Sequence, residues 1–161
     1  MKDITMLAII GLFGIGTSHA QITKVDQEVY GMDCAPCAYG LERGLKKMEG
    51  LKYVRVSLND GKAYLELATE NKLTLQDIQE EVKKNGFSAK KAQITISGTV
   101  KKENGLWVIE TGQELFDISQ HSPTELVQAL TPGMATVSGT VEDEEDGNLS
   151  GRWAIILTKV K

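Results

Sequence analysis

GMDCAPC, at residues 31–37, contains both cysteines of this 161-residue chain, spaced C-x-x-C. The residues before this stretch read as a strand, and those after it recur at helical spacing. A disulfide that closes so short a loop removes little chain entropy, so the pair would be a poor structural staple. The sequence therefore indicates a working thiol pair, either a metal site or a redox site.

The first 20 residues have the pattern of a secretory signal. Lys2 precedes an apolar core of roughly 13 residues, which is signal-peptide length and shorter than the ~20 residues that span a bilayer. Ser18-His19-Ala20 offers a small-x-small cleavage site. We expect residues 1–20 to be a signal peptide, with an uncleaved anchor as the alternative. The mature protein would then be exported, periplasmic or secreted, and not membrane-spanning, in a compartment where thiols can be oxidised.

The composition is that of a globular protein and argues against a nucleic-acid partner. Apolar residues make up 41% and charged residues 25% of the chain, and the net charge is −4. No basic block is present, so the electrostatic footprint of a nucleic-acid-binding protein is missing. The length suits one ordinary domain or two small ones.

Residues 22–92 predict an α+β domain of order βαββαβ. Gln27 interrupts the apolar face of the first strand, and Thr74 with Asp77 forms a capping box at the second helix. This order is that of a ferredoxin-like sandwich, with two helices on one face of an antiparallel sheet. The expected elements are strands at 22–30, 53–58, 63–67 and 87–92 and helices at 36–48 and 74–85.

These residues resemble the heavy-metal-associated (HMA) domain, the module of copper chaperones, mercury-binding periplasmic proteins and metal-exporting P-type ATPases. The resemblance rests on G-M-x-C-x-x-C at the first strand-to-helix turn and on Gly86-Phe87 after the second helix. It covers about 70 residues, with departures at Gln27 and Pro36. It implies that a soft ion is captured by Cys34 and Cys37 and passed to a metal-exporting ATPase or efflux component.

Thiolates select soft ions, here Cu(I) or Zn(II), Cd(II) and Hg(II). Cys37, in the first helical turn, faces the positive end of the helix dipole, which lowers the pKa of a thiol. We expect Met32 to be a buried anchor under the loop and Phe87 to pack beneath it. Asp33 is a candidate third ligand for a divalent ion, as in zinc, cadmium and lead exporters; alternatively, it only caps the helix.

Two other functions stay open. CAPC at residues 34–37 resembles redox centres, so a thiol–disulfide oxidoreductase is the main alternative, although βαββαβ is not the thioredoxin order. An oxidised pair is also expected as a metal-free resting state. A non-catalytic interaction module is the other alternative. With His121 the lone histidine after residue 20 and no phosphate loop, we expect no enzyme.

Residues 93–161 predict a second domain that resembles an OB-fold barrel. The expected order is βββαβ and a last strand, with Ser-Gly-Thr-Val at 97–100 and again at 138–141, and the mid-strand glycines suit bent barrel strands. Ser122 with Glu125 reads as a capping box. We expect the aromatic residues to pack in the core or at its rim, His121 to be a solvated loop residue, and the acidic run 142–148 to be a solvated loop.

Overall fold

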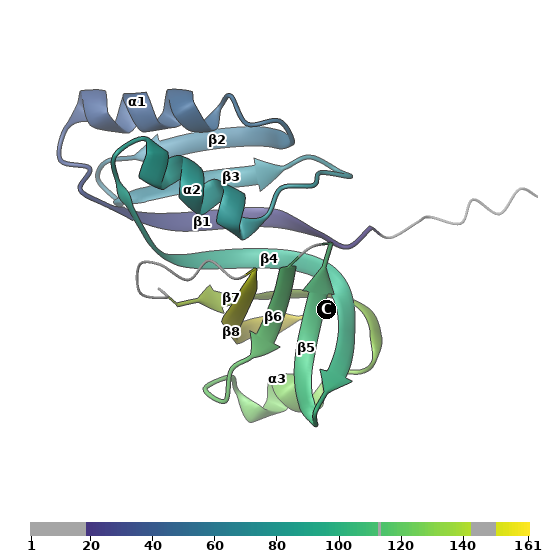
Figure 1. Cartoon of the computed structure of the whole chain (residues 1–161). Helices are drawn as coiled ribbons and strands as arrows, with labels where there is room; N and C mark the ends of the chain where they lie inside the picture. Colours follow the sequence, from purple (N-terminus) through teal and green to yellow (C-terminus); the bar gives the residue numbers. More distant parts are fainter. Residues whose placement is uncertain (1–18, 113, 143–150) are drawn as a thin grey trace, which may run out of the picture.

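The computed structural model describes residues 19–112, 114–142 and 151–161 (Figure 1). Nearly all of the predicted signal peptide, and the acidic run beyond Glu142, lie outside the described residues. The first half consists of β1 (Gln21–Tyr30), α1 (Ala35–Leu45), β2 (Leu51–Ser57), β3 (Lys62–Leu67), α2 (Leu75–Lys84) and β4 (Ser88–Glu103). The second half consists of β5 (Leu106–Thr111), β6 (Glu114–Ile118), α3 (Thr124–Gln128), β7 (Gly133–Val141) and β8 (Arg152–Val160).

The first half is the predicted ferredoxin-like sandwich. Its strands lie in the order β2-β3-β1-β4, with neighbours antiparallel, and α1 and α2 cover one face (Figure 1). The capping box of α2 is confirmed: the Asp77 amide donates to Thr74 Oγ1 at 3.0 Å, and the Thr74 amide donates to Asp77 Oδ2 at 2.9 Å. The α+β prediction for this half is therefore confirmed.

Strand β4 joins the two halves, and here the prediction was wrong in one respect. Two separate strands were expected, one ending at Ala92 and one beginning near Ile94. The structure has a single strand of 16 residues. Neither Ala92 nor Gln93 is a residue type that favours a turn, so the chain stays extended through both. One edge of β4 pairs with β1 and then β5, and the other edge pairs with β7. The predicted boundary at 92/93 thus falls inside one strand.

The second half is a closed cycle of strand pairings. Neighbours follow the order β4-β5-β6-β8-β7, and β7 pairs again with β4. All of these pairs are antiparallel except β6 with β8, which is parallel. Phe116 and Trp153 are 0% and 2% exposed, and Trp107 is partly buried against the same core, so these aromatic residues pack as expected.

The two mid-strand glycines permit close approach of neighbouring strands. A Cβ atom on Gly98 would lie 2.6 Å from the carbonyl oxygen of Glu110, and one on Gly139 would lie 2.5 Å from that of Ile156. Both distances are far below van der Waals contact, so only glycine fits. The repeated Ser-Gly-Thr-Val segments therefore mark two close approaches of neighbouring strands in this ring, whereas the bend that was expected of these glycines stays a prediction.

The predicted capping box at Ser122 is wrong. Helix α3 has Pro123 at its N-cap position and no side-chain cap. The Ser122 hydroxyl is directed to strand β8 instead: it accepts from the Leu157 amide at 3.0 Å and donates to the Ile155 carbonyl at 3.4 Å. The Ser122 hydroxyl, which its spacing from Glu125 predicted to cap α3, therefore bonds to the backbone of β8 instead.

Candidate metal centre

The C-x-x-C stretch forms the turn between β1 and α1, as predicted. Gly31 has a φ of +88°, a left-handed conformation that suits glycine. Met32 then points inward and is only 6% exposed, as a member of the hydrophobic core. Met32 is therefore the buried anchor that the sequence predicted. It holds the base of the turn while the following residues reach the surface.

Cys34 begins the helix. It is the N-cap of α1, and its Sγ accepts from the Cys37 amide at 3.1 Å. The alternative in which Asp33 caps α1 is therefore wrong, because the cap position is one residue later and is occupied by sulfur. Pro36 sits in the first turn, where its missing N–H costs nothing. The helix dipole thus acts on Cys34 Sγ as well as on Cys37.

Cys34 and Cys37 are joined by a disulfide, with their Cα atoms 5.1 Å apart. Both residues are half-buried, so the pair is reachable from solvent. A disulfide offers no thiolate to a soft ion. The pair becomes a two-sulfur ligand set only after two electrons and two protons have reduced it to two thiols, which bind as thiolates.

Asp33 is exposed beside the two cysteines. Within residues 19–112, 114–142 and 151–161, no three His, Cys, Asp or Glu side chains are gathered so that they could hold an ion. The donor set that the described residues bring together is therefore the two sulfurs. A ligand role for Asp33 stays a prediction.

Phe87 lies under the turn, as predicted. A Cβ atom on Gly31 would be 3.9 Å from Phe87 Cδ1, and Phe87 is partly buried against the core. The Phe87 amide donates to the Val82 carbonyl at 3.3 Å, just after Gly86 with its φ of +91°. The end of α2 thus places this ring at the base of the turn formed by residues 31–37.

Helix α1 is fixed to the sheet by Glu42. Its Oε2 accepts from the Val56 amide of β2 at 3.0 Å, and its Oε1 pairs with Lys46. The hydrogen bond from Lys46 and then that from Val56 hold the pKa of Glu42 below its usual value. The helix that carries Cys37 is therefore tied to the outermost strand as well as to the core.

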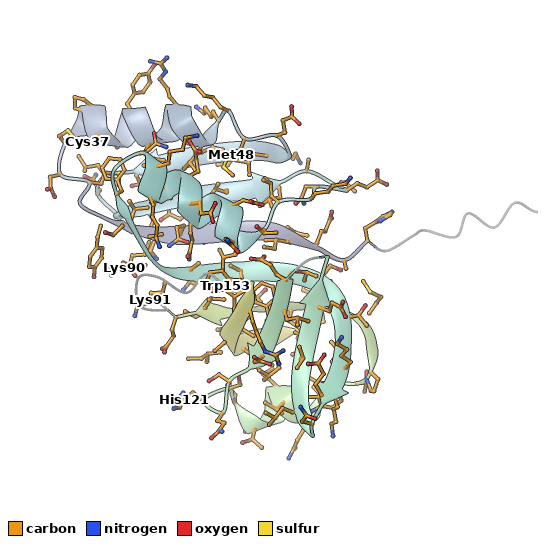
Figure 2. All side chains as sticks on the ribbon, viewed as in Figure 1. Cys37, Met48, Lys90, Lys91, His121 and Trp153 are labelled. Carbon is orange, nitrogen blue, oxygen red and sulfur yellow. A yellow bond between two sulfur atoms is a disulfide. The ribbon has the colours of Figure 1, made fainter. Side chains whose placement is uncertain are left out.

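Exposed aromatic residues flank the turn. Tyr30 and Tyr39 are 57% and 64% exposed. A cationic side chain lies over each ring. Lys90 Nζ is 5.8 Å from the centre of the Tyr30 ring, and Arg43 Cζ is 5.9 Å from the centre of the Tyr39 ring. In Figure 2, Cys37 lies in the upper part of the molecule, Lys90 lies below it, and His121 lies lower still, in the second half. His121 is exposed, as expected of a loop histidine.

Sequence reasoning noticed Gln27 but missed its role. Its side chain is fully buried, and Nε2 donates to the Lys90 carbonyl at 2.6 Å while Oε1 accepts from Gln79 of α2 at 3.2 Å. The β1–β4 register shifts between Gln27 and Val29, which marks a bulge two residues before the metal turn. The signal was one polar residue on an apolar face; apart from the adjacent Glu28 carbonyl, the partners named here lie more than 50 positions away.

Residues 28–88 match the family model of the heavy-metal-associated domain. Two curated relatives are copper-transporting ATPases: one from Helicobacter felis is 31% identical over 74 residues, and one from Helicobacter pylori is 38% identical over 64 residues. The matches cover 46% and 40% of this chain but only 10% and 8% of those relatives.

Among solved structures, a copper binding domain of a P-type ATPase is 31% identical, and the alignment covers 42% of this chain and 89% of that one with a TM-score of 0.40. No helix in the part of the chain that the structure describes is long and apolar enough to cross a membrane. The sequence match falls on the βαββαβ half and includes the turn of Cys34 and Cys37. Residues 28–88 of this chain are therefore a heavy-metal-associated domain.

Proposed function

We propose that this protein is an exported carrier that captures a soft metal ion between Cys34 and Cys37 and passes it on by ligand exchange. The observation that carries the proposal is the pair of half-buried sulfurs at the start of α1. Two sulfurs on one turn suit linear coordination and leave a side open to the thiolate of a partner. An ATPase or efflux component is the proposed recipient, and no chemical reaction on an organic substrate is involved.

Among the candidate ions we favour Cu(I). The two curated relatives are copper transporters by name, and the described donor set is sulfur only. Zn(II) prefers four ligands in a tetrahedron, so a divalent ion would need Asp33 and an exogenous group as well. Zn(II), Cd(II) and Hg(II) remain in the proposal as ions that the same thiolates would accept.

The disulfide supports a second candidate function. An exchange centre must cycle between the dithiol and the disulfide, and Cys34–Cys37 is present as a disulfide on a surface turn. The hydrogen bond from the Cys37 amide to Cys34 Sγ would stabilise a thiolate at Cys34, which is the attacking form in exchange. A thiol–disulfide oxidoreductase therefore stands as the alternative.

We also propose that the ring of β4 to β8 is an OB-like barrel that serves stability or partner binding. The support is its pairing order, with one parallel pair and a helix between the third and fourth strands of the ring. OB-folds take oligonucleotides or oligosaccharides. The buried positions of Phe116 and Trp153 do not favour base stacking here.

A titration of the reduced protein tests the metal proposal. Cu(I), Zn(II) and Hg(II) are added against a competing chelator to the wild type and to Cys34→Ser, Cys37→Ser and Asp33→Ala, with Glu125→Ala as a control at an exposed glutamate. We expect one Cu(I) per chain in the wild type and none held tightly by either serine variant. Selective weakening of Zn(II) in Asp33→Ala would make the carboxylate a ligand. Failure of all three ions to bind stoichiometrically, together with reduction of insulin disulfides, would replace the proposal with the redox one.

A further inference from the structure

Glu114, at the start of β6, connects the second half to a helix of the first. Glu114 is 2% exposed, and its carboxylate accepts three hydrogen bonds. The amides of Leu75 and Gln76, the first residues of α2, donate to Oε2 at 2.7 Å and to Oε1 at 3.1 Å. The indole Nε1 of Trp153 on β8 donates to Oε1 at 2.9 Å. A residue nearly 40 positions downstream thus satisfies two amides that the helix itself cannot.

The opposite end of α2 reaches the metal turn, which is the turn at residues 31–37 that contains Cys34 and Cys37. Ten residues at about 1.5 Å each make a rod of about 15 Å. Beyond its last turn, Asn85 packs closely against Gly44 of α1, where a Cβ atom would lie 2.6 Å from Asn85 Nδ2, and Phe87 lies under Gly31. Midway, Gln79 donates to Gln27 in the bulge of β1. One helix therefore contacts the ring at its start and the helix and turn of both cysteines at its end.

We propose that Glu114 is a positioning residue for the metal turn and acts through α2, so that the second half governs how tightly Cys34 and Cys37 hold an ion. Packed elements move as rigid bodies, because side chains in a dense interior have no room to adjust one by one. Releasing the start of α2 therefore changes where Phe87 presses on the turn and where Asn85 presses on α1. Conversely, an ion held at the turn stabilises the ring, because coupling between two sites is reciprocal. The metal part of this inference rests on the proposed function.

The first experiment needs no metal. Amide resonances of the whole reduced protein are compared for the wild type, Glu114→Gln and the control Glu125→Gln, whose glutamate is exposed on α3. The carboxamide keeps the size of the side chain but offers one acceptor oxygen where three donors converge. We expect the amides of Gly31, Cys37 and Phe87 to shift in Glu114→Gln and to stay in place in Glu125→Gln. Shifts that stop within α2 would overturn the proposal.

Trp153→Phe is the second variant, for the case in which Glu114→Gln does not fold. It removes one of the three donors and keeps an aromatic ring in the core. The same resonances should shift from their wild-type positions. Unchanged positions of Gly31 and Cys37 in this variant would again contradict the coupling.

The second experiment uses Cu(I). Both tryptophans lie in the second half, so fluorescence-monitored unfolding reports the ring alone. Bound Cu(I) should raise the unfolding midpoint in the wild type, and Glu114→Gln should bind one ion with an affinity lowered on the order of 5-fold or more. Stoichiometric binding that leaves the fluorescence midpoint unmoved would refute the coupling while the carrier function stands. Absence of any binding would refute the carrier function, and the metal-free resonances would then decide the coupling alone.

Discussion

Replacing Gln27 by leucine tests how much the buried carboxamide near the turn at residues 31–37 contributes to stability. The substitution keeps the volume and removes both polar ends. The Lys90 carbonyl then loses a donor at 2.6 Å, the Glu28 carbonyl loses one at 2.9 Å, and the Gln79 amide nitrogen loses its acceptor at 3.2 Å. A buried polar group left without a partner costs about 1–3 kcal/mol, and these three groups, two of them on half-buried residues, give about 2–4 kcal/mol of lost stability once a small apolar gain is subtracted.

Urea unfolding followed by far-UV circular dichroism, which reports the strands and helices of both halves, measures the loss directly. The matched control is Gln93→Leu, at an exposed position of β4, where we expect a change within about 0.5 kcal/mol. The double variant Gln27→Leu with Gln79→Leu removes both members of the pair, so it should be less destabilised than the sum of the single changes, by about 0.5–3 kcal/mol.

The outcome that would refute this reasoning is specific. If Gln27→Leu were as stable as Gln93→Leu, the carboxamide would not be needed to hold the β1–β4 bulge. If the double variant lost the full sum of both changes, the two side chains would act independently and the 3.2 Å contact would carry no energy.

Three further predictions concern how substitutions and pH change the stability of the second half. Gly98→Ala and Gly139→Ala each force a Cβ atom against a backbone carbonyl, and we expect each to cost about 1–3 kcal/mol in urea unfolding. Ser122→Ala removes the acceptor of a buried β8 amide and should cost about 1–2 kcal/mol, whereas Glu125→Ala, its partner in the failed capping box, should change the free energy of unfolding little. Burial raises the pKa of Glu114 above the ordinary 4.5 despite its three donors, with nearby Asp77 adding to the increase. The unfolded chain therefore gives up this proton first, so the free energy of unfolding should decrease as pH rises from about 4.5 through the raised pKa, and a smaller decrease should be seen in Glu114→Gln.

The first half could be predicted because its signals are local. The alternation in β3, the capping box at Thr74 and the C-x-x-C turn each fix an element within a few residues. The single polar residue on the apolar face of β1 was also visible. What decides the role of Gln27, however, is a helix and a strand more than 50 positions away, and no spacing within β1 encodes them.

Two features of the second half could not be predicted because the groups that decide them are distant in the sequence. Ser122 and Glu125 have the spacing of a capping box, yet an amide of β8, 35 positions further on, takes the hydroxyl. The carboxylate of Glu114 accepts from the Leu75 amide, 39 positions before it, and from the Trp153 indole, 39 positions after it. Periodicity reports which face of an element is buried, but it does not report which distant group arrives there. Asp33 differs from these residues, because the structure places it beside Cys34 and a metal titration is what tests whether it is a ligand.

The continuity of β4 explains how the two halves share one structure. A βαββαβ sandwich standing alone leaves the outer edge of its fourth strand open, and open edges invite pairing with other chains. Here β7 pairs along that edge from Ala92 to Val100. Within the described residues, the outer edge of β2 is then the one left without a strand partner, and Glu42 blocks part of it by accepting from the Val56 amide. Because β7 covers the edge of β4 and Glu42 occupies an amide at the edge of β2, binding of a partner by strand addition is disfavoured. A partner that takes the ion would then meet the turn of Cys34 and Cys37 itself, flanked by Tyr30 and Tyr39.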